Sequence, residues 1–341
     1  MKALLIGGSG NISSAISKQL AAEGHELYLL NRGNKSHNVP EGANVLIGDI
    51  HNEAEISKLL DGQRFDVVAD FVAFAPEDVE RDYRLFNRKT DQYIFISSAN
   101  TYQKPLVSPI TTETSPQSNP FWTNSSAKID CEKVLYAHFQ NDRFPITIVR
   151  PSHTYGEEFL PLSIQGANGP WSVVSRMLRG KPVLIQGDGT IFWTVTYNTD
   201  FAEAFIGLMG NPHAIGQAVN VMGEECLTWN QIYELIAKKL GVELKPLHVT
   251  TDLLIAAEEK YGYNFTGGLL GDKSNTAIFD TSKLKSLVPG YVGAIRFDQA
   301  LETIIPNFLS NPALQVEDPA FDAFSDRVAE ALHAAEQSLL A

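Results

Sequence analysis

The sequence has little cysteine, no long hydrophobic run and a shortage of positive charge. Its 341 residues include two cysteines, Cys131 and Cys226, which are too few for a disulfide framework and lack the paired spacing of a zinc site. We expect both to pack as small side chains in a reducing compartment. No apolar stretch approaches the roughly 20 residues of a membrane span, and no export segment follows Met1. These absences predict a cytoplasmic protein without a membrane partner or a metal site.

The charge balance also excludes a class of partners. The chain carries 27 Lys and Arg against 40 Asp and Glu, which gives a formal net charge of −13. Affinity for a nucleic acid comes largely from Lys and Arg that displace counterions from phosphates, so we do not expect nucleic acid as a partner. Hydrophobic residues make up 44% and charged residues 20%, which is typical of a packed globular protein.

Short apolar runs alternate with helical patterns over residues 1–152, and this alternation is typical of parallel strands joined by crossover helices. The expected strands are 2–6, 26–30, 44–47, 66–72, 92–97 and 146–150. The expected helices are 12–23, 53–60, 76–88 and 125–139. The sequence therefore predicts an α/β fold with a doubly wound parallel sheet in its first domain.

The remaining chain is less regular. Residues 153–310 mix short strands, such as 183–185 and 217–221, with helices at 199–209, 228–240 and 252–261. They predict a smaller mixed α/β substrate domain, with some segments returning to the first domain. Residues 311–341 predict a C-terminal amphipathic helix, because apolar residues recur there at helical spacing from Phe321 to Leu339. We expect this apolar face to pack on the parent domain or on a second subunit, so a homodimer stays open.

A glycine-rich turn, Gly7-Gly8-Ser9-Gly10-Asn11-Ile12-Ser13, follows the first expected strand and opens the first helix. In this context the turn is typical of dinucleotide binding, because the unsatisfied N–H groups at the helix N-terminus favour a pyrophosphate. Ser13 stands at the third glycine position and is small enough for close helix packing. An ordinary βα turn without a ligand is the alternative. The residues expected to contact the pyrophosphate are Gly7, Gly10, Asn11 and Ile12.

Two further segments, at the ends of the second and third expected strands, bear on how the cofactor binds. The second strand ends at Asn31-Arg32, where NAD would usually meet an acidic residue and NADP an arginine. With Arg32 there and Lys35 nearby, we favour NADP(H) over NAD(H), the alternative for Arg32 being a solvated loop residue. Asp49 and Ile50 follow the third strand, and we expect them beside the adenine. Asp49 is alternatively the N-cap of the following helix.

Four motifs together resemble the extended short-chain dehydrogenase/reductase superfamily, and more narrowly the NAD-dependent epimerase/dehydratase family, from residue 1 to about 310. They are the glycine turn, Gly48-Asp49, Ile96-Ser97-Ser98-Ala99-Asn100-Thr101-Tyr102 and Arg150-Pro151-Ser152-His153-Thr154-Tyr155-Gly156. The resemblance implies a Rossmann domain that binds NAD(P)(H) and a smaller domain that closes over a small-molecule substrate. It also implies an oxidoreductase or epimerase whose chemistry rests on a Ser or Thr, a Tyr and a Lys.

The catalytic set is incomplete in this chain. The family's Ser matches Ser98, and its Lys matches Lys128, which would reach the nicotinamide ribose or, alternatively, be a solvated helix lysine. The Tyr four residues before that Lys is Asn124. A phenol can transfer a proton to a substrate oxygen, whereas an amide can only hydrogen-bond to it. We therefore expect a slower or rerouted proton transfer.

Two other residues are candidates for the missing proton donor. Tyr102 follows Ser98 on the same loop, although relatives commonly carry a structural Tyr there. His153 occupies a position that lines the pocket in relatives, and imidazole titrates near neutrality. A buried, hydrogen-bonded histidine at a strand end is the alternative for His153.

The motifs also narrow the range of possible substrates. Relatives that act on nucleotide-sugars place an Arg after the segment that matches Gly187–Thr190, whereas this chain continues with Ile191-Phe192-Trp193. With Phe121, Trp122 and Trp171, the aromatic Trp193 favours a neutral, sugar-like ring; alternatively these aromatics form a core between domains. Dehydration is disfavoured because Ala99 and Asn100 stand where sugar dehydratases carry an acidic residue.

Two other functions stay open. Asn124 is compatible with a non-catalytic NAD(P) sensor or scaffold protein. An RNA-associated role, which occurs among atypical members of the superfamily, is disfavoured by the net charge of −13.

Overall fold

The structure is a computed structural model that describes residues 1–33 and 39–341. The chain forms two compact units. Unit 1 comprises Met1–Thr154, Thr196–Glu224 and Phe279–Ala294, and unit 2 comprises Tyr155–Val195, Glu225–Ile278 and Ile295–Ala341.

Unit 1 contains a seven-stranded parallel sheet in the order β11-β7-β5-β4-β1-β2-β3. The sheet confirms the predicted Rossmann-type fold. The segment 217–221, expected among the short strands of the second region, pairs with β7 at the sheet edge. The strands are β1 (Lys2–Ile6), β2 (Glu26–Asn31), β3 (Asn44–Ile47), β4 (Phe65–Asp70), β5 (Thr90–Ile96), β7 (Ile146–Pro151) and β11 (Gln217–Val221).

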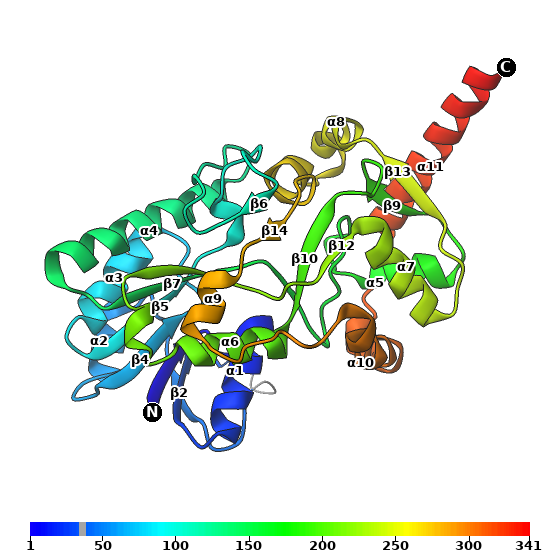
Figure 1. The fold of residues 1–341 in the computed structure, drawn as a ribbon. Helices are drawn as coiled ribbons and strands as arrows, with labels where there is room; N and C mark the ends of the chain where they lie inside the picture. Colours follow the sequence, from blue (N-terminus) through cyan, green and yellow to red (C-terminus); the bar gives the residue numbers. More distant parts are fainter. Residues whose placement is uncertain (34–38) are drawn as a thin grey trace. The chain divides into compact units, whose positions relative to one another are not determined.

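Helices cover both faces of this sheet (Figure 1). Alternate side chains of a strand point to opposite faces, so Leu5 packs in the core with Ile16 of α1 and Phe205 of α6. Its neighbour Leu4 packs on the other face with the helices α2, α3 and α4. The helices of unit 1 are α1 (Asn11–Ala22), α2 (Glu53–Leu59), α3 (Pro76–Phe86), α4 (Thr123–Asp142), α6 (Asn198–Leu208) and α9 (Ser282–Leu287).

Unit 2 is smaller and mixed in structure. Strand β10 (Phe192–Tyr197) pairs antiparallel with β12 (Cys226–Thr228), and β9 (Val183–Gln186) pairs parallel with β13 (Pro246–Val249). A π-helix at Thr266–Lys273 lies among the helices of this unit. The α-helices are α5 (Trp171–Leu178), α7 (Trp229–Leu240), α8 (Thr251–Tyr261), α10 (Phe297–Ser310) and α11 (Pro319–Leu340). Short elements complete the chain: η2 (Ala99–Thr101), β6 (Ile110–Thr111), β8 (His153–Tyr155), η3 (Pro212–Ala214), β14 (Ile278–Phe279) and η5 (Pro312–Leu314).

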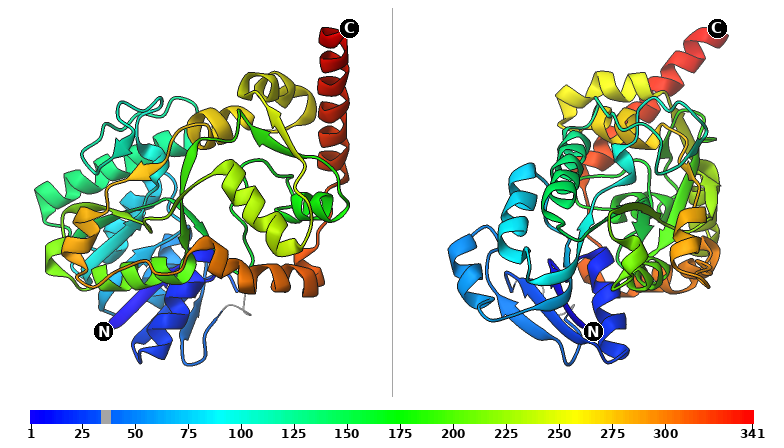
Figure 2. Two further views of the ribbon diagram at one scale, coloured as in Figure 1. Left: turned by 45° about the vertical axis from the view of Figure 1, so that its right-hand side comes forward. Right: turned by 60° about the vertical axis from the view of Figure 1, so that its left-hand side comes forward.

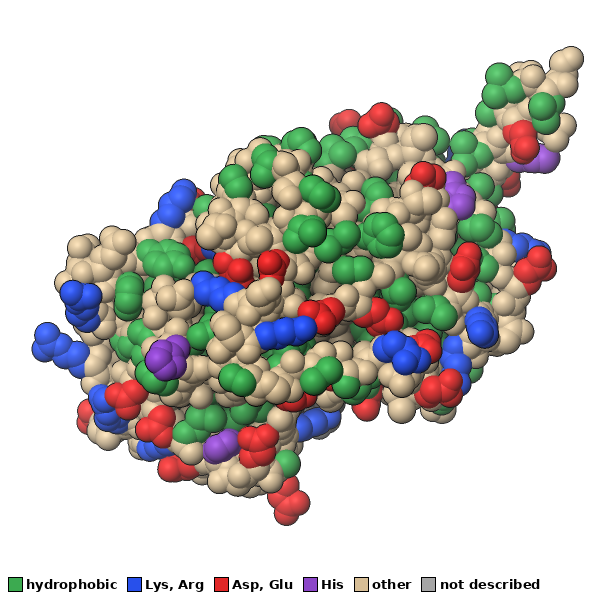
Figure 3. Space-filling view, viewed as in Figure 1, with side chains coloured by type: hydrophobic (Ala, Val, Ile, Leu, Met, Phe, Trp, Pro, Cys, Tyr) green, Lys and Arg blue, Asp and Glu red, His purple; other side chains and the backbone are tan. Residues whose placement is uncertain are grey.

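The C-terminal helix α11 packs on unit 2 by its first half. Phe321 and Phe324 are buried, and Phe324 contacts the rings of Tyr261 and Tyr263. The last turns extend beyond the other elements of unit 2 (Figure 2), and the exposed end carries hydrophobic and charged side chains (Figure 3). Within the described ranges, no helix is both long enough and apolar enough to cross a membrane.

Candidate dinucleotide and catalytic site

The glycine-rich turn between β1 and α1 has a backbone that needs its glycines. Gly7 has a φ of +82°, and a Cβ atom there would lie 2.4 Å from Val72 Cγ1. A Cβ on Gly8 would lie 2.6 Å from Leu29 Cδ2. The turn therefore sits directly against β2 and the end of β4, as a close approach of backbone to a dinucleotide requires.

Ser13 does more in this turn than fill a small space. Its hydroxyl donates to the carbonyl of Gly7 and accepts from the N–H of Gly10, both at 2.8 Å. Ser17, one turn further along α1, donates to the carbonyl of Gly8 at 2.9 Å. Hydroxyl groups of the helix thus hold the turn in place, which a glycine at position 13 could not do.

A cavity of about 440 Å³ opens beside this turn, within the usual size range of ligand pockets. It brings together six of the residues predicted to bind the cofactor: Gly7, Gly10, Asn31, Arg32, Asp49 and Ile50. The positive end of a helix, an exposed Arg and an apolar wall suit the phosphates and the adenine of a dinucleotide. The remaining lining residues are Ile6, Ser9, Leu30, His51, Val72 and Phe74.

The polar residues at the rim are held by local bonds. The side-chain oxygen of Asn31 accepts from Gly33 N at 2.9 Å, and Oδ1 of Asp49 accepts from His51 N at 3.0 Å. The N-cap of α2 is Asn52, which accepts from Glu55 N, so the alternative N-cap role for Asp49 is wrong. Arg32 is exposed, and Lys35 lies outside the described residues.

Asn11 and Ile12 do not line the cavity. The side-chain amide of Asn11 donates to the carbonyl of Thr154 at 3.0 Å, which ties the start of α1 to β8. Ile12 is half-buried and packs against the core on the face of the sheet that α1 and α6 cover. Their predicted contacts with the pyrophosphate stay a prediction and would come from backbone groups at the N-terminus of α1.

The cavity wall formed by Val72 and Phe74 was not predicted from the sequence. Both follow β4, which neighbours β1 in the sheet. Because ligands of doubly wound sheets bind at the carboxyl ends of the strands, the residues after β4 could have been included once β4 was placed beside β1.

Lys128 is buried, with 7% of its surface exposed, which excludes the solvated-lysine alternative. Its Nζ donates to the carbonyls of Ala73 at 2.6 Å and Ile96 at 2.7 Å. The ring centroid of Phe74 lies 4.3 Å from the same ammonium. Burial lowers the pKa of Lys128 to about 8, although the carboxylate of Asp70 acts in the opposite direction.

Asn124 and Ser98 are more accessible than Lys128. Asn124 lies in the first turn of α4, one helical turn before Lys128, and is exposed. Ser98 follows β5, is half-buried, and its hydroxyl oxygen accepts from Asn100 N at 3.1 Å. The carbonyl of Ile96, two residues before Ser98, is one of the two that accept from Lys128, so β5 helps to position both groups.

Tyr102 belongs to a buried polar network. Its hydroxyl donates to Asn220 Oδ1 at 2.6 Å and accepts from Arg150 Nη1 at 3.0 Å. Arg150 also pairs with Glu132, one turn beyond Lys128 on α4, and Glu132 accepts from Ser97. Burial raises the pKa of Tyr102 to about 12, against the effect of Arg150. These contacts favour the structural interpretation of Tyr102.

His153, the other candidate proton donor, begins β8 and is partly exposed. The next residue, Thr154, accepts the bond from Asn11. His153 is therefore one residue from the strand position that is tied to the cofactor turn.

The aromatic residues predicted to stack on a substrate differ in accessibility. Trp193 is 3% exposed and its ring lies 5.1 Å from that of Trp229. Trp171 is also buried, and its Nε1 donates to Glu317 at 3.0 Å. Both pack inside unit 2. Phe121 and Trp122 precede α4 and are exposed and half-buried, respectively.

Neither Cys131, which is buried, nor Cys226, which is partly buried, forms a disulfide bond, and Sγ of Cys226 lies 3.1 Å from Oγ1 of Thr194. Across residues 1–33 and 39–341, no group of three or more His, Cys, Asp or Glu side chains is arranged to hold a metal ion.

Comparisons with known proteins identify the family of this chain. The model of the NAD-dependent epimerase/dehydratase family matches residues 3–221. The chain is 23% identical over 295 residues to 2'-dehydrokanamycin reductase of Streptomyces kanamyceticus, covering 85% of this chain and 80% of that protein. It is 26% identical over 253 residues to chloroplast stem-loop binding protein of 41 kDa b of Arabidopsis thaliana, covering 70% of this chain and 63% of that protein.

The fold is similar to that of UDP-glucuronic acid 4-epimerase from Bacillus cereus, solved with UDP-glucuronic acid and NAD. The TM-score is 0.72 at 20% identity, over 91% of this chain and 99% of that chain. The family match covers the glycine turn, Ser98, Lys128 and β11 in one stretch. The chain thus belongs to the NAD-dependent epimerase/dehydratase family and is an enzyme of the extended short-chain dehydrogenase/reductase type.

Proposed function

We propose that this protein is an NAD(P)-dependent oxidoreductase or epimerase that acts on an alcohol or carbonyl group of a sugar-like ring, with Asn124 in place of the usual catalytic Tyr. The observation that carries the proposal is the cavity beside the glycine turn. Phe74 lines this cavity and also contacts Lys128. The cofactor residues and the catalytic lysine are therefore linked through one side chain.

Each group of residues has a distinct part in binding the cofactor. The turn at Gly7–Gly10 and the N-terminus of α1 would hold the pyrophosphate. Asp49 and Ile50 would contact the adenine, and Lys128 would donate to the ribose hydroxyls next to the nicotinamide. Arg32 would pair with a 2′-phosphate, since no acidic residue stands at Asn31, and it supports NADP(H) over NAD(H). When bound, the nicotinamide supplies or accepts a hydride.

In the reduction direction, the substrate carbonyl carbon gains the hydride and its oxygen needs a proton. Ser98 and Asn124 would hydrogen-bond to that oxygen and stabilise the developing charge. Neither is an acid at neutral pH, so the proton would come from water or from His153. Tyr102 is the weaker candidate, because its hydroxyl is bound to Asn220 and Arg150 and its pKa is raised.

We infer an unphosphorylated ring as the substrate. The phosphate-binding Arg of nucleotide-sugar enzymes is absent after Thr190, and among the similar proteins is a reductase of 2'-dehydrokanamycin. With Trp171 and Trp193 buried in unit 2, the aromatic residues left to stack on a ring are Phe121 and Trp122. The nucleotide-sugar bound by the Bacillus cereus epimerase is the competing class.

Two measurements test this proposal. NADPH and NADH are titrated by fluorescence against the wild type and Arg32→Ala; we expect NADPH to bind more tightly, and the preference to fall about tenfold or more in the variant. Nicotinamide absorbance is then followed with a panel of ketosugars, sugar alcohols and UDP-sugars. Failure of both dinucleotides to bind contradicts the proposal, a preference for NADH contradicts the role of Arg32, and turnover confined to UDP-sugars contradicts the substrate class.

A further inference from the structure

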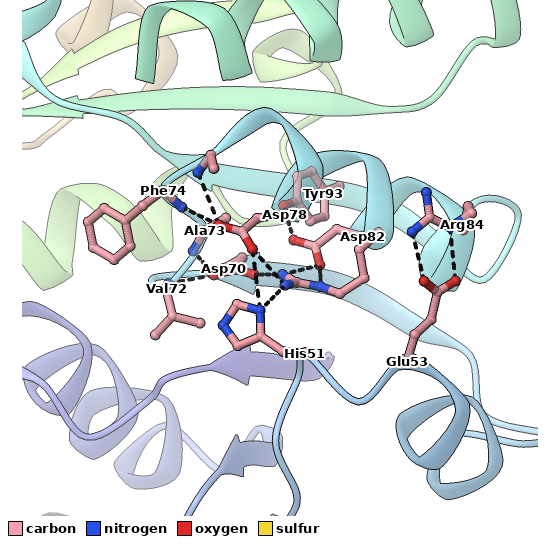
Figure 4. Close-up of polar contacts among 12 residues, drawn as sticks. His51, Glu53, Asp70, Val72, Ala73, Phe74, Asp78, Asp82, Arg84 and Tyr93 are labelled. Atoms are coloured by element: carbon pink, nitrogen blue, oxygen red, sulfur yellow. Dashed lines mark hydrogen bonds and ion pairs between the residues drawn. The ribbon is translucent and has the colours of Figure 1, made fainter. Parts of the chain in front are cut away.

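A buried charged cluster of unit 1, centred on Arg81, Asp70 and Asp82, lies beside the turn that connects β4 to α3 (Figure 4). We propose that Arg81 is a positioning residue for the cofactor site: through Asp70 it fixes the turn at Val72–Phe74, which is both a wall of the cavity and a binding site for Lys128. The inference rests on the proposed function for its consequences in binding and turnover, and on the chain's own contacts for its geometry.

Asp70 holds the turn through hydrogen bonds to two of its backbone amides. It is the last residue of β4, has no exposed surface, and its Oδ1 accepts from Val72 N at 2.5 Å and from Ala73 N at 2.8 Å. Its second oxygen, Oδ2, lies 3.4 Å from Nη2 of Arg81. Removing one partner of a buried ion pair is costly, so the guanidinium of Arg81 stabilises the Asp70 carboxylate in the position from which it binds both amides.

Arg81 is itself held in one position by three further groups. Its Nε and Nη2 donate to Oδ1 of Asp82 at 3.0 and 2.8 Å, and its Nη1 donates to Asp78 at 2.9 Å. Nη1 also lies 3.2 Å from Nδ1 of His51, a residue of the cavity wall. The guanidinium therefore connects α3 to both the end of β4 and the segment after β3.

The turn held in this way reaches two parts of the site. Val72 contacts the position of Gly7, where an added Cβ would lie 2.4 Å from its Cγ1. The carbonyl of Ala73 accepts from Lys128, and the ring of Phe74 lies over the same ammonium. A shift of the turn would thus move the cavity wall and the partner of the catalytic lysine together.

Asp82 also binds Arg81 but does not contact the turn, so its substitution is a control for that of Arg81. It is fully buried and its Oδ2 accepts from the Tyr93 hydroxyl at 2.6 Å. Burial, together with the nearby charge of Asp70, raises the pKa of Asp82 well above its usual range. Asp82→Asn removes the charge at this position and keeps a carbonyl oxygen that can accept from Arg81, so it should be tolerated better than the loss of Arg81.

The experiment compares Arg81→Met with Arg84→Met, a matched substitution on the same helix. Arg84 is exposed and pairs with Glu53 at 2.9 and 2.7 Å. Hydrogen exchange is measured first on the protein without dinucleotide. We expect exchange of the Val72 and Ala73 amides to rise about tenfold or more in Arg81→Met, relative to the amides of β1, and to stay unchanged in Arg84→Met.

Dinucleotide affinity and turnover are measured second. In Arg81→Met we expect NADPH affinity to fall about tenfold and kcat to fall with it. KM for the substrate should change less than threefold, because the residues proposed to bind the substrate, Ser98, Phe121 and Trp122, lie outside this turn. Arg81→Lys keeps the charge and should restore part of both effects; it also serves as the test variant if Arg81→Met does not fold.

Unchanged exchange at Val72 and Ala73 in a folded Arg81 variant would overturn the proposal, as would an equal rise in all amides. Because exchange is read without a bound dinucleotide, this result is independent of the proposed function. A wild type that binds no dinucleotide would contradict the proposed function and the cofactor half of this inference, while the exchange data would still decide the geometry.

Discussion

The glycine-rich turn and the Lys128 site are two parts of the same unit that are held together in different ways. In the turn, the partners are close in sequence: Ser13 binds Gly10 and Gly7, three and six positions away. Lys128 is bound to carbonyls 55 and 32 positions away. The turn therefore depends on local geometry, whereas the Lys128 site depends on how β4, β5 and α4 pack.

This difference predicts different responses to substitution. Changes in the turn should weaken cofactor binding and lower stability through local strain and steric clashes. Changes at Lys128 should alter how the free energy of unfolding depends on pH, because protonation of a buried amine is coupled to the folding equilibrium.

The largest effect is expected from Gly7→Ala. The new Cβ would lie 2.4 Å from Val72 in a backbone with a φ of +82°, so both strain and a clash oppose folding. We expect a loss of about 2–4 kcal/mol in the free energy of unfolding and at least a hundredfold loss in NADPH affinity. Gly24→Ala is the control, since Gly24 has a φ of +77° with nothing within 4 Å. Equal losses in both variants, by urea unfolding and titration, would remove the steric argument.

The second effect is the pH dependence of stability at Lys128. Its pKa is about 8 in the folded protein against 10.5 for an ordinary lysine, so the unfolded chain binds more protons between these values. The free energy of unfolding should therefore rise as the pH increases from about 8 to about 10, by an amount on the order of 3 kcal/mol at most. Lys128→Met should remove this rise.

The control for Lys128→Met is Lys133→Met on the same helix, where the side chain is 70% exposed. Urea unfolding at pH 7, 8, 9 and 10 measures the slopes. Parallel slopes for the wild type and Lys128→Met would contradict the assigned burial of the ammonium.

The smallest effect is expected from Ser13→Ala. It leaves the carbonyl of Gly7 and the N–H of Gly10 without the hydroxyl that binds both, which costs about 1–2 kcal/mol. Ser14→Ala removes a single 3.4 Å bond to Asn11 and should cost less than about 0.5 kcal/mol. Thermal unfolding of the two variants gives the comparison, and a Ser13 variant as stable as the Ser14 variant would show that the hydroxyl is dispensable.

The sequence predicted most of the sheet, because each βα unit carries its apolar run and its turn within some thirty residues. It also predicted six residues of the cavity, since they follow three neighbouring strands. It could not predict the Arg81 cluster. Six of the eight residues 77–84 are charged, and only the contacts of α3 with Asp70 at the end of β4 and Tyr93 of β5 show that Arg81 and Asp82 point inward. Burial of Trp193 against Trp229 depends on long-range packing in the same way.

We propose that the cofactor site is complete while the proton relay lacks its phenol at Asn124. The most direct test is the rate of hydride transfer against pH for the wild type and Asn124→Tyr, using the best substrate from the panel. We predict that Asn124→Tyr raises turnover and adds one titrating group with a pKa below 10, because the buried ammonium of Lys128 lies one helical turn away. A lower turnover in Asn124→Tyr would contradict this account, and a loss of about a hundredfold in His153→Ala would then assign the proton to His153 rather than to water.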